Sequence, residues 1–122
     1  MLKERGFQVL DHGTDSEAPA DYPEYAHAVA GDVTDHSADL GLLVCGNGLG
    51  MSMVANRHMG VRAARCLTTE DARSSRTHNN ANILCLGGRI TDAEEAKAIL
   101  STFIESQFEG GRHARRVSQF DL

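Results

Sequence analysis

The sequence predicts one α/β domain with a mostly parallel sheet, and three observations support this prediction. Short apolar runs with β-branched character alternate with longer segments of helical period. Glycine, asparagine and aspartate, which favour turns, bound these apolar runs. The chain has 122 residues, of which 41% are hydrophobic. A chain of this size buries one core, so residues 1–122 are expected to form a single domain.

Four apolar runs are expected to form buried strands. They are residues 7–10 (FQVL), 39–45 (DLGLLVC), 61–65 (VRAAR) and 82–86 (NILCL). Near-continuous apolar runs of this length are typical of parallel strands. The residues before the first run, MLKERG, resemble the last turn of a helix rather than the beginning of a domain.

Helices are predicted in the segments between the strands. The expected ranges are 22–36, 48–58, a helix that begins at 68–71, and about 92–108. The third begins with Thr-Thr-Glu-Asp, whose acidic residues suit the positive end of a helix dipole. The fourth carries apolar residues at inward spacing, and Gly110 and Gly111 end it before a short arginine-rich helix.

Composition excludes several classes of function. The net charge of −5 and the isoelectric point near 5.6 give no electrostatic footprint for nucleic-acid binding. No apolar stretch approaches the roughly 18 residues of a membrane span, and the first ten residues lack a signal peptide's apolar segment. A cytoplasmic protein is expected. Cys45, Cys66 and Cys85 lack CxxC spacing and lie in apolar runs, which indicates reduced thiols and argues against zinc.

The strongest local pattern is LLVCGNGLGMSMVANR at 42–57, a strand that ends in Cys45 before a glycine-rich turn and a helix. Glycines 46, 48 and 50 allow a tight turn whose backbone N–H groups can hold an oxyanion. The same positive field favours a thiolate at Cys45, which could then act as a base. On spacing alone, a buried core cysteine before a glycine-rich connection is the favoured interpretation, because a single GxGxG pattern is weak evidence.

A second pattern, SSRTHNNANILCLGGR at 74–89, places His78 and Asn79 between a helix and a strand. Histidine exchanges protons near neutral pH, and an asparagine amide can bind a sugar hydroxyl. A solvated histidine at a helix end is the alternative interpretation. Arg89 follows a Gly-Gly pair after the strand, where it could meet a phosphate or a surface carboxylate.

The tail, EGGRHARRVSQF at 109–120, concentrates positive charge in an acidic protein. Arg112, His113, Arg115 and Arg116 lie within five positions, and Arg112 and Arg116 share one helical face. Guanidinium groups can bind phosphate oxygens in a bidentate manner, so the tail suits an anionic substrate. A solvated basic patch is the alternative.

Taken together, CGNGLG, RTHNNANILCLGGR and FEGGRHARRV resemble, in order and approximate spacing, the family of ribose-5-phosphate isomerase B and the galactose-6-phosphate isomerase subunits. The stretch VLDHGTDSEAPADYPEYA is also similar to the family's second strand and following loop. The resemblance implies a Rossmann-like three-layer α/β/α domain. It also implies interconversion of an aldose phosphate and its ketose through a cis-enediolate, without a cofactor or metal, in the pentose phosphate pathway.

The resemblance assigns a role to each candidate residue. Cys45 corresponds to the base that moves the proton between C1 and C2, and His78 to the acid that opens the sugar ring. The backbone amides of the turn would stabilise the enediolate oxygen; they belong to Gly46, Asn47, Gly48, Leu49 and Gly50. Asn79 would contact sugar hydroxyls. Arg89, Arg112 and Arg116 would hold the phosphate, with His113 assisting.

Two comparisons with the family pattern concern the turn itself. Some relatives replace the cysteine and place a glutamate base four residues later, where this chain has Leu49, so Cys45 has no competing carboxylate in the turn. Asn47 stands where relatives that use the cysteine often have threonine. Asparagine can still donate a hydrogen bond to a substrate oxygen, which indicates tuning of the site.

The chain departs from the family at its N-terminus. The family has a first strand that ends in an Asp-His pair, whereas Asp11 and His12 fall at the end of the second strand and do not inherit that role. A late start-codon assignment is our favoured explanation, and a truncated relative is the alternative. For the chain as printed, we expect exposed apolar neighbours of the first strand and weak or absent activity.

Family sites are shared between two subunits, so the resemblance implies a homodimer, or a tetramer of paired dimers, that binds a small phosphosugar. The expected substrate pair is ribose 5-phosphate and ribulose 5-phosphate; a hexose 6-phosphate, of galactose or allose, is an alternative. Two other hypotheses are a non-catalytic sugar-phosphate-binding subunit and a redox-sensing thiol protein, the latter without a resolving cysteine near Cys45.

Overall fold

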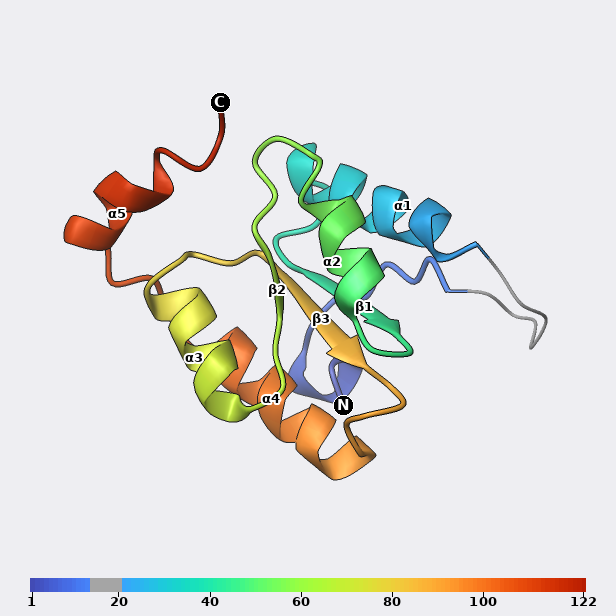
Figure 1. The fold of residues 1–122 in the computed structure, drawn as a ribbon. Coiled ribbons are helices and arrows are strands. Elements are labelled where there is room, and N and C mark those ends of the chain that lie inside the picture. Colours follow the sequence, from blue (N-terminus) through green and yellow to red (C-terminus); the bar gives the residue numbers. More distant parts are fainter. Residues whose placement is uncertain (14–20) are drawn as a thin grey trace.

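The structure is a computed structural model that describes residues 1–13 and 21–122. Its elements in chain order are η1 (Lys3–Arg5), α1 (Tyr22–Thr34), β1 (Gly41–Cys45), α2 (Leu49–Ala55), β2 (Ala63–Arg65), α3 (Thr69–Thr77), β3 (Ile83–Gly87), α4 (Ala93–Glu105) and α5 (Arg112–Val117) (Figure 1). In the described part of the chain, no helix is long and apolar enough to cross a membrane.

The sheet is parallel, and β3 lies between the other two strands in the order β1-β3-β2. Gly41 pairs with Ile83 at one end of β1, and Cys45 pairs with Gly87 at the other. Strand β2 pairs with the first three residues of β3, from Ala63 opposite Ile83 onward. The carboxyl ends of β1 and β3 therefore meet at the same edge of the sheet, directly beside the glycine-rich turn.

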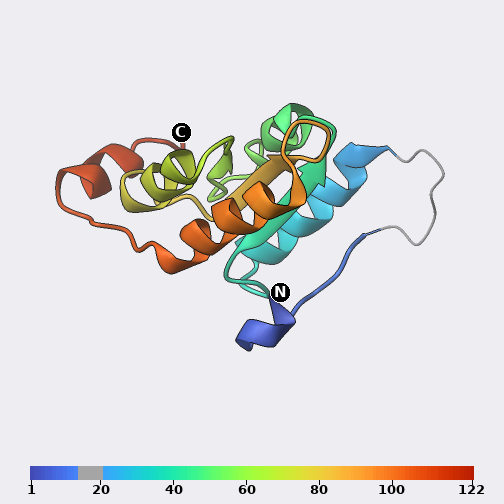
Figure 2. The same cartoon turned by 90° about the horizontal axis from the view of Figure 1, so that it is seen from below.

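Helices cover both faces of this sheet, so its central strand β3 is buried along its whole length. On one face α1 and α2 pack Ala26, Ala30, Met51 and Ala55 against Leu43, Ile83 and Cys85. On the other face α3 and α4 pack Ala72, Ile99 and Phe103 against Leu84 and Leu86. The three-layer α/β/α arrangement expected from the sequence is confirmed, and its layers can be followed in Figure 2.

Three of the four predicted strands and all predicted helices are present. Most are shorter than expected, and β3 has the expected length but lies one residue further along the chain. The prediction of a strand at residues 7–10 is wrong, because this segment has no strand pairing in the structure. The side chains of FQVL are of the kind found in buried strands. A strand, however, also needs a neighbouring strand that pairs with its backbone N–H and C=O groups. Residues 14–20, part of the stretch similar to the family's loop, lie outside the described residues.

A hollow of about 720 Å³ separates residues 7–13 from β1. Its walls include the outer edge of β1 and apolar side chains of α4, among them Leu100 and Phe103. In the described residues β1 pairs only with β3, so its outer edge carries backbone groups without a strand partner. Phe7, Leu10 and Val44 are 44%, 51% and 52% exposed around this hollow.

The opening residues form a single 3-10 turn, close to the helix end predicted from MLKERG. Gly6 ends the turn with φ of +88°, a conformation that favours glycine. The Arg5 guanidinium donates to Glu105 Oε1 at 2.8 Å and to Ser101 Oγ at 3.4 Å. This short element is therefore fastened to the outside of α4 rather than to the sheet.

Phe103 provides a test of the core on the α4 face. Its side chain is 1% exposed, and the guanidinium carbon of Arg76 lies 5.3 Å from the centroid of its ring. We expect Phe103→Ala to lower the free energy of unfolding by about 3–5 kcal/mol, measured by urea denaturation. The control is Phe7→Ala in the exposed N-terminal segment, which should cost less than about 1 kcal/mol. Equal losses in the two variants would contradict this assignment of the core.

Candidate active site

Cys45 lies at the carboxyl end of β1, where its half-buried thiol meets the glycine-rich turn. The backbone N–H of Gly48 donates a hydrogen bond to Cys45 Sγ, with 3.1 Å between nitrogen and sulfur. An N–H donor directed at sulfur is the kind of contact that can stabilise negative charge developing there. The turn thus supplies the kind of contact that a cysteine base requires.

The other two cysteines have a different environment. Burial raises the pKa of Cys66 to about 11 and that of Cys85 to about 12. Both side chains are buried in the core, so they remain protonated thiols near neutral pH. The chain therefore divides its cysteines into two structural thiols and one, Cys45, at the edge of the sheet.

The glycines of the turn allow the backbone to approach its neighbours closely. Gly48 adopts φ of +80°, and a Cβ atom at this position would lie 3.1 Å from the backbone carbon of Leu86. Gly50 packs against the Tyr22 ring, since a Cβ atom there would lie 2.6 Å from Tyr22 Cζ. Asn47 Oδ1 accepts a hydrogen bond from the backbone N–H of Leu49 at 3.0 Å, which stabilises the turn from within.

Two arginines flank the turn. The Arg89 backbone N–H donates to the Gly46 carbonyl at 3.0 Å, and its side chain lies against Gly46. Arg65 Nε donates to the Asn47 carbonyl at 2.6 Å. Sequence reasoning identified Arg89 but missed Arg65. The signal for Arg65 was available, because it is a charged residue at the carboxyl end of a strand, the edge at which α/β domains bind ligands.

Asn79 is exposed beyond the end of α3, away from the turn. It lines a hollow of about 440 Å³ that runs along β2, and Arg65 lines the same hollow. Asp11 and His12 are occupied elsewhere: His12 Nε2 lies 2.5 Å from Asp32 Oδ2 in α1, and Asp11 Oδ1 accepts from the Gly13 N–H at 2.8 Å.

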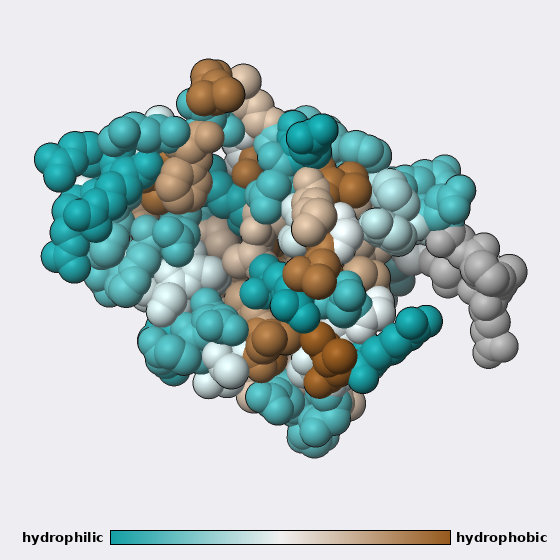
Figure 3. Space-filling view, viewed as in Figure 1, coloured by the Kyte–Doolittle hydropathy of each residue, from teal (hydrophilic) through white to brown (hydrophobic). Residues whose placement is uncertain are grey.

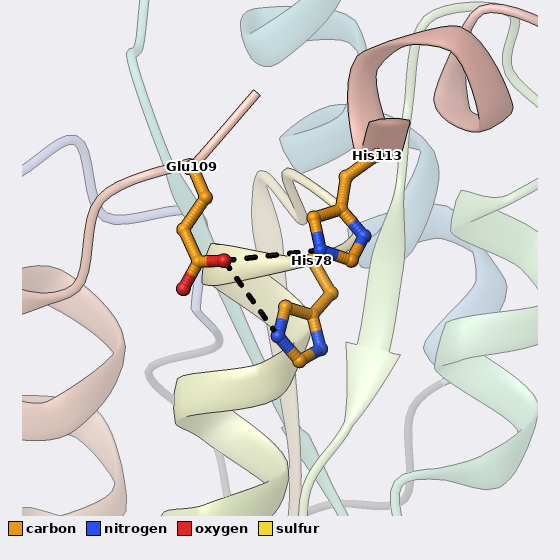
Figure 4. A group of neighbouring side chains, drawn as sticks. All are labelled: His78, Glu109 and His113. Atoms are coloured by element: carbon orange, nitrogen blue, oxygen red, sulfur yellow. Dashed lines mark ion pairs between the residues drawn. The ribbon is translucent and has the colours of Figure 1, made fainter. Parts of the chain in front are cut away.

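The remaining candidates gather around the start of α5 (Figure 4). His78, at the end of α3, stacks on His113 with ring centroids 4.4 Å apart and ring planes 14° apart. Glu109 Oε1 lies 3.9 Å from His78 Nε2 and 3.8 Å from His113 Nε2. Arg112 and Arg116 are exposed one helical turn apart on α5. Sequence reasoning did not identify Glu109 as a site residue, although it is the first residue of the tail motif EGGRHARRVSQF.

The electrostatics of this second cluster are uneven. Partial burial lowers the pKa of His113, and the positive charges of His78, Arg112 and Arg116 lower it further, against the opposing effect of Glu109. His113 is therefore biased toward the neutral imidazole. The two histidines and Glu109 place three possible metal ligands within 4.8 Å of one another. However, the lone pairs of nearly parallel rings lie in parallel planes and do not converge on one ion, so this arrangement suits proton handling better than metal binding.

Within one chain, the two clusters lie at opposite ends of the sheet. Cys45 and Gly87 mark the carboxyl ends of β1 and β3, whereas His78 precedes β3, which begins at Ile83. At about 3.3 Å per residue, the five residues of β3 separate these ends by roughly 13 Å. Figure 1 shows α5 and the entry into β3 on the far side of the sheet from the turn after β1. A single subunit thus brings Arg89 to Cys45 but leaves His78, Arg112 and Arg116 apart from them.

Comparison with known proteins gives a consistent result. A family profile described as Ribose/Galactose Isomerase matches residues 1–120. The ribose-5-phosphate isomerase B of Escherichia coli K12 is 45% identical over 116 residues, which cover 95% of this chain and 78% of that protein. The D-erythrulose-4-phosphate isomerase of Pectobacterium atrosepticum is 38% identical over 120 residues, covering 97% of this chain and 78% of that protein.

Solved structures agree with this assignment. The ribose 5-phosphate isomerase of Thermotoga maritima superposes with a TM-score of 0.96 at 52% identity, covering 98% of this chain and 83% of that one. The ribose-5-phosphate isomerase B of Mycoplasma genitalium, solved with bound ribulose-5-phosphate, has a TM-score of 0.93 at 42% identity and covers 97% of this chain and 79% of that one. With sequence and fold in agreement, this chain belongs to the Ribose/Galactose Isomerase family.

Proposed function

We propose that this chain is an aldose-ketose isomerase of sugar phosphates that interconverts ribose 5-phosphate and ribulose 5-phosphate. The observation that carries the proposal is the hydrogen bond from the Gly48 N–H to Cys45 Sγ inside the glycine-rich turn. It supports a thiolate beside backbone donors that can stabilise an enediolate, which is what proton transfer next to a carbonyl requires. The relatives named for ribose 5-phosphate and the bound ribulose-5-phosphate of one of them support this substrate pair.

The reaction would proceed in three steps. The His78 imidazolium gives its proton to the ring oxygen, the ring C1–O bond breaks, and the anomeric hydroxyl loses its proton to water as the aldehyde forms. The Cys45 thiolate then removes the proton from C2, and the electron pair moves through the C1–C2 bond to the carbonyl oxygen, where amides of the turn stabilise the enediolate. Proton transfer from O2 and return of the carbon-bound proton to C1 complete the ketose. The ring C1–O bond that opens and the protons that move are all accounted for within substrate, protein and water, so atoms and electrons balance without a redox reagent.

Binding would rely on the arginines around the site. Arg112 and Arg116, one turn apart on α5, can bind two oxygens of a phosphate, while Arg89 adds positive charge beside Gly46. Asn79 is available for sugar hydroxyls, and His113 for the phosphate. Gly46, Asn47, Gly48, Leu49 and Gly50 provide the backbone of the oxyanion site. These assignments rest on the motif positions together with the two clusters described above.

We infer that the complete site forms between two copies of the chain. The Cys45 turn and the His78 cluster lie at opposite ends of one subunit, so a two-fold dimer could bring the turn of one copy to the cluster of the other. Exposed apolar side chains near the turn support such an interface: Leu49, Met53 and Ile90 are 40%, 66% and 53% exposed. Figure 3 shows apolar side chains gathered over α2 and the neighbouring end of the sheet.

A sugar-phosphate-binding subunit without activity is the second candidate function. The observation that favours it is the open edge of β1, which leaves a hollow beside Val44, the residue before Cys45. A site next to an open edge is less rigidly held than one beside a paired strand. Among substrates, a hexose 6-phosphate of galactose or allose remains the alternative to the pentose phosphate, since pocket length depends on how two copies meet.

The base assignment is tested by Cys45→Ala, assayed for conversion of ribose 5-phosphate to ribulose 5-phosphate in the presence of a chelator. Loss of the base should lower kcat by about 10²–10⁴-fold. Cys66→Ala, which removes a buried thiol away from the turn, is the matched control and should retain most activity. Turnover that persists in Cys45→Ala would overturn the base assignment. A wild-type chain that binds ribose 5-phosphate without converting it would favour the binding-subunit function.

Thiol labelling tests the division of the cysteines without requiring turnover. In the native protein at pH 8, iodoacetamide should modify Cys45 at least about tenfold faster than Cys66 or Cys85, because the raised pKa values and burial of the latter two suppress their thiolates. Peptide mass spectrometry provides the rates. Labelling of Cys66 and Cys85 should stay slow up to about pH 10, because their raised pKa values keep both thiols protonated below that pH. Equal labelling of all three would contradict the assignment.

The shared site is tested by mixing two inactive variants. Cys45→Ala and His78→Asn chains, unfolded and refolded together in equal amounts, should recover about a quarter of wild-type activity, because half of the dimers are mixed and each has one intact site. Cys45→Ala mixed with Arg89→Ala is the control, since both changes fall in the same half of the site and no full site can form. Light scattering should confirm that both mixtures contain dimers. If activity recovers in neither mixture, or only in the control mixture, the shared site is refuted.

A further inference from the structure

Glu109 connects two elements that carry candidate residues, α3 and α5. Its backbone N–H donates to the Thr77 carbonyl at 3.0 Å, which ties it to the end of α3 one residue before His78. Gly110 and Gly111 then reverse the chain with φ of +72° and +58°, so that α5 brings His113 to the same carboxylate. The backbone contact and the glycine turn therefore hold the main chain of Glu109 where its carboxylate can reach both imidazoles (Figure 4).

The stacked imidazoles cannot both be protonated at low cost. Their centroids are 4.4 Å apart, and two positive rings at this distance repel each other. Glu109 Oε1 is almost equally distant from the two Nε2 atoms, at 3.9 Å from His78 and 3.8 Å from His113. One carboxylate can compensate one positive charge, so the arrangement favours one imidazolium and one neutral imidazole.

The surroundings decide which ring receives that proton. The side chain of His113 is 12% exposed and that of His78 is 46% exposed, so water stabilises a charge on His78 more effectively. Burial lowers the pKa of His113, and the positive charges of His78 and of Arg112 and Arg116 on the same helix α5 lower it further. The charged groups that face the pair are thus Glu109, which attracts a proton, and the two arginines, which disfavour it at His113.

We propose that Glu109 is a positioning residue whose carboxylate makes His78, rather than His113, the imidazole that carries the proton for ring opening. The inference rests on the proposed role of His78 as the ring-opening acid, but the location of the proton is a property of the free protein. It gives the two histidines distinct tasks: His78 donates the proton, and neutral His113 remains available as a hydrogen-bond partner for the phosphate. It also explains why the acid lies beside a cluster of arginines, which by itself would discourage protonation.

The first measurement is of protonation, by long-range ¹H–¹⁵N NMR of the histidine side chains in the full chain between pH 5 and 9. In the wild type, His78 should be the ring that shows the protonated pattern while His113 is neutral. In Glu109→Gln, which keeps the shape and removes the charge, the protonated population of His78 should fall roughly three- to tenfold at a fixed pH. A proton that resides on His113, or no change in Glu109→Gln, would overturn the proposal even if the chain shows no turnover.

The second measurement is kinetic. Glu109→Gln should lower kcat for ribose 5-phosphate by about three- to tenfold, a part of the 10²–10⁴-fold that an acid contributes, with KM changed less than about twofold. The alkaline limb of the kcat profile should move to lower pH, and Glu109→Asp should restore it in part. Glu105→Gln is the matched control, because this nearby glutamate pairs with Arg5 and not with a histidine. A loss of kcat without movement of the alkaline limb would indicate a merely structural role and refute the proposal.

Discussion

The parallel pairing of β1 with β3 is the constraint on which the rest of the structure depends. Its register places Cys45 opposite Gly87, so the turn after β1 and the turn after β3 emerge side by side. The Gly88 N–H donates to the Cys45 carbonyl at 2.7 Å and the Arg89 N–H to the Gly46 carbonyl at 3.0 Å, which extends the pairing into the turns. A shift of one residue would turn Cys45 to the other face of the sheet and remove its contact with Gly48.

The same topology explains why one subunit holds two incomplete clusters. In a parallel sheet every strand points the same way, so residues that follow strands and residues that precede them lie at opposite edges. Cys45, Arg65 and Arg89 follow or end strands, whereas His78 and Asn79 precede one. A reaction that uses both sets needs either a chain that wraps around the sheet or a second copy. The two-fold arrangement that we propose satisfies this requirement with one sequence, and it would cover part of the apolar surface near α2.

The open edge of β1 and the cluster at α5 illustrate different sources of order. Around Glu109, a backbone hydrogen bond to Thr77 and a glycine turn bring α3 and α5 together, so the carboxylate lies within reach of both rings. Beside Val44, the sheet ends in a hollow with exposed apolar side chains, and residues 7–13 cross it without forming a ladder. A few contacts are enough to bring one charged side chain, such as Glu109, near its partners. A strand forms only where a continuous row of backbone groups finds partners.

The sequence by itself determined the fold class, the order of the helices, three of the strands and the residues on which the proposed chemistry rests. It could do so because buried parallel strands and their glycine turns leave a local pattern in the sequence. The motif CGNGLG also contains both the cysteine and the residues whose backbone N–H groups surround it. Only the tertiary structure decided that residues 7–10 do not pair, that Arg65 and Tyr22 border the turn, and that Glu109 lies between His78 and His113. These outcomes depend on contacts between residues distant in the chain, which no local pattern encodes.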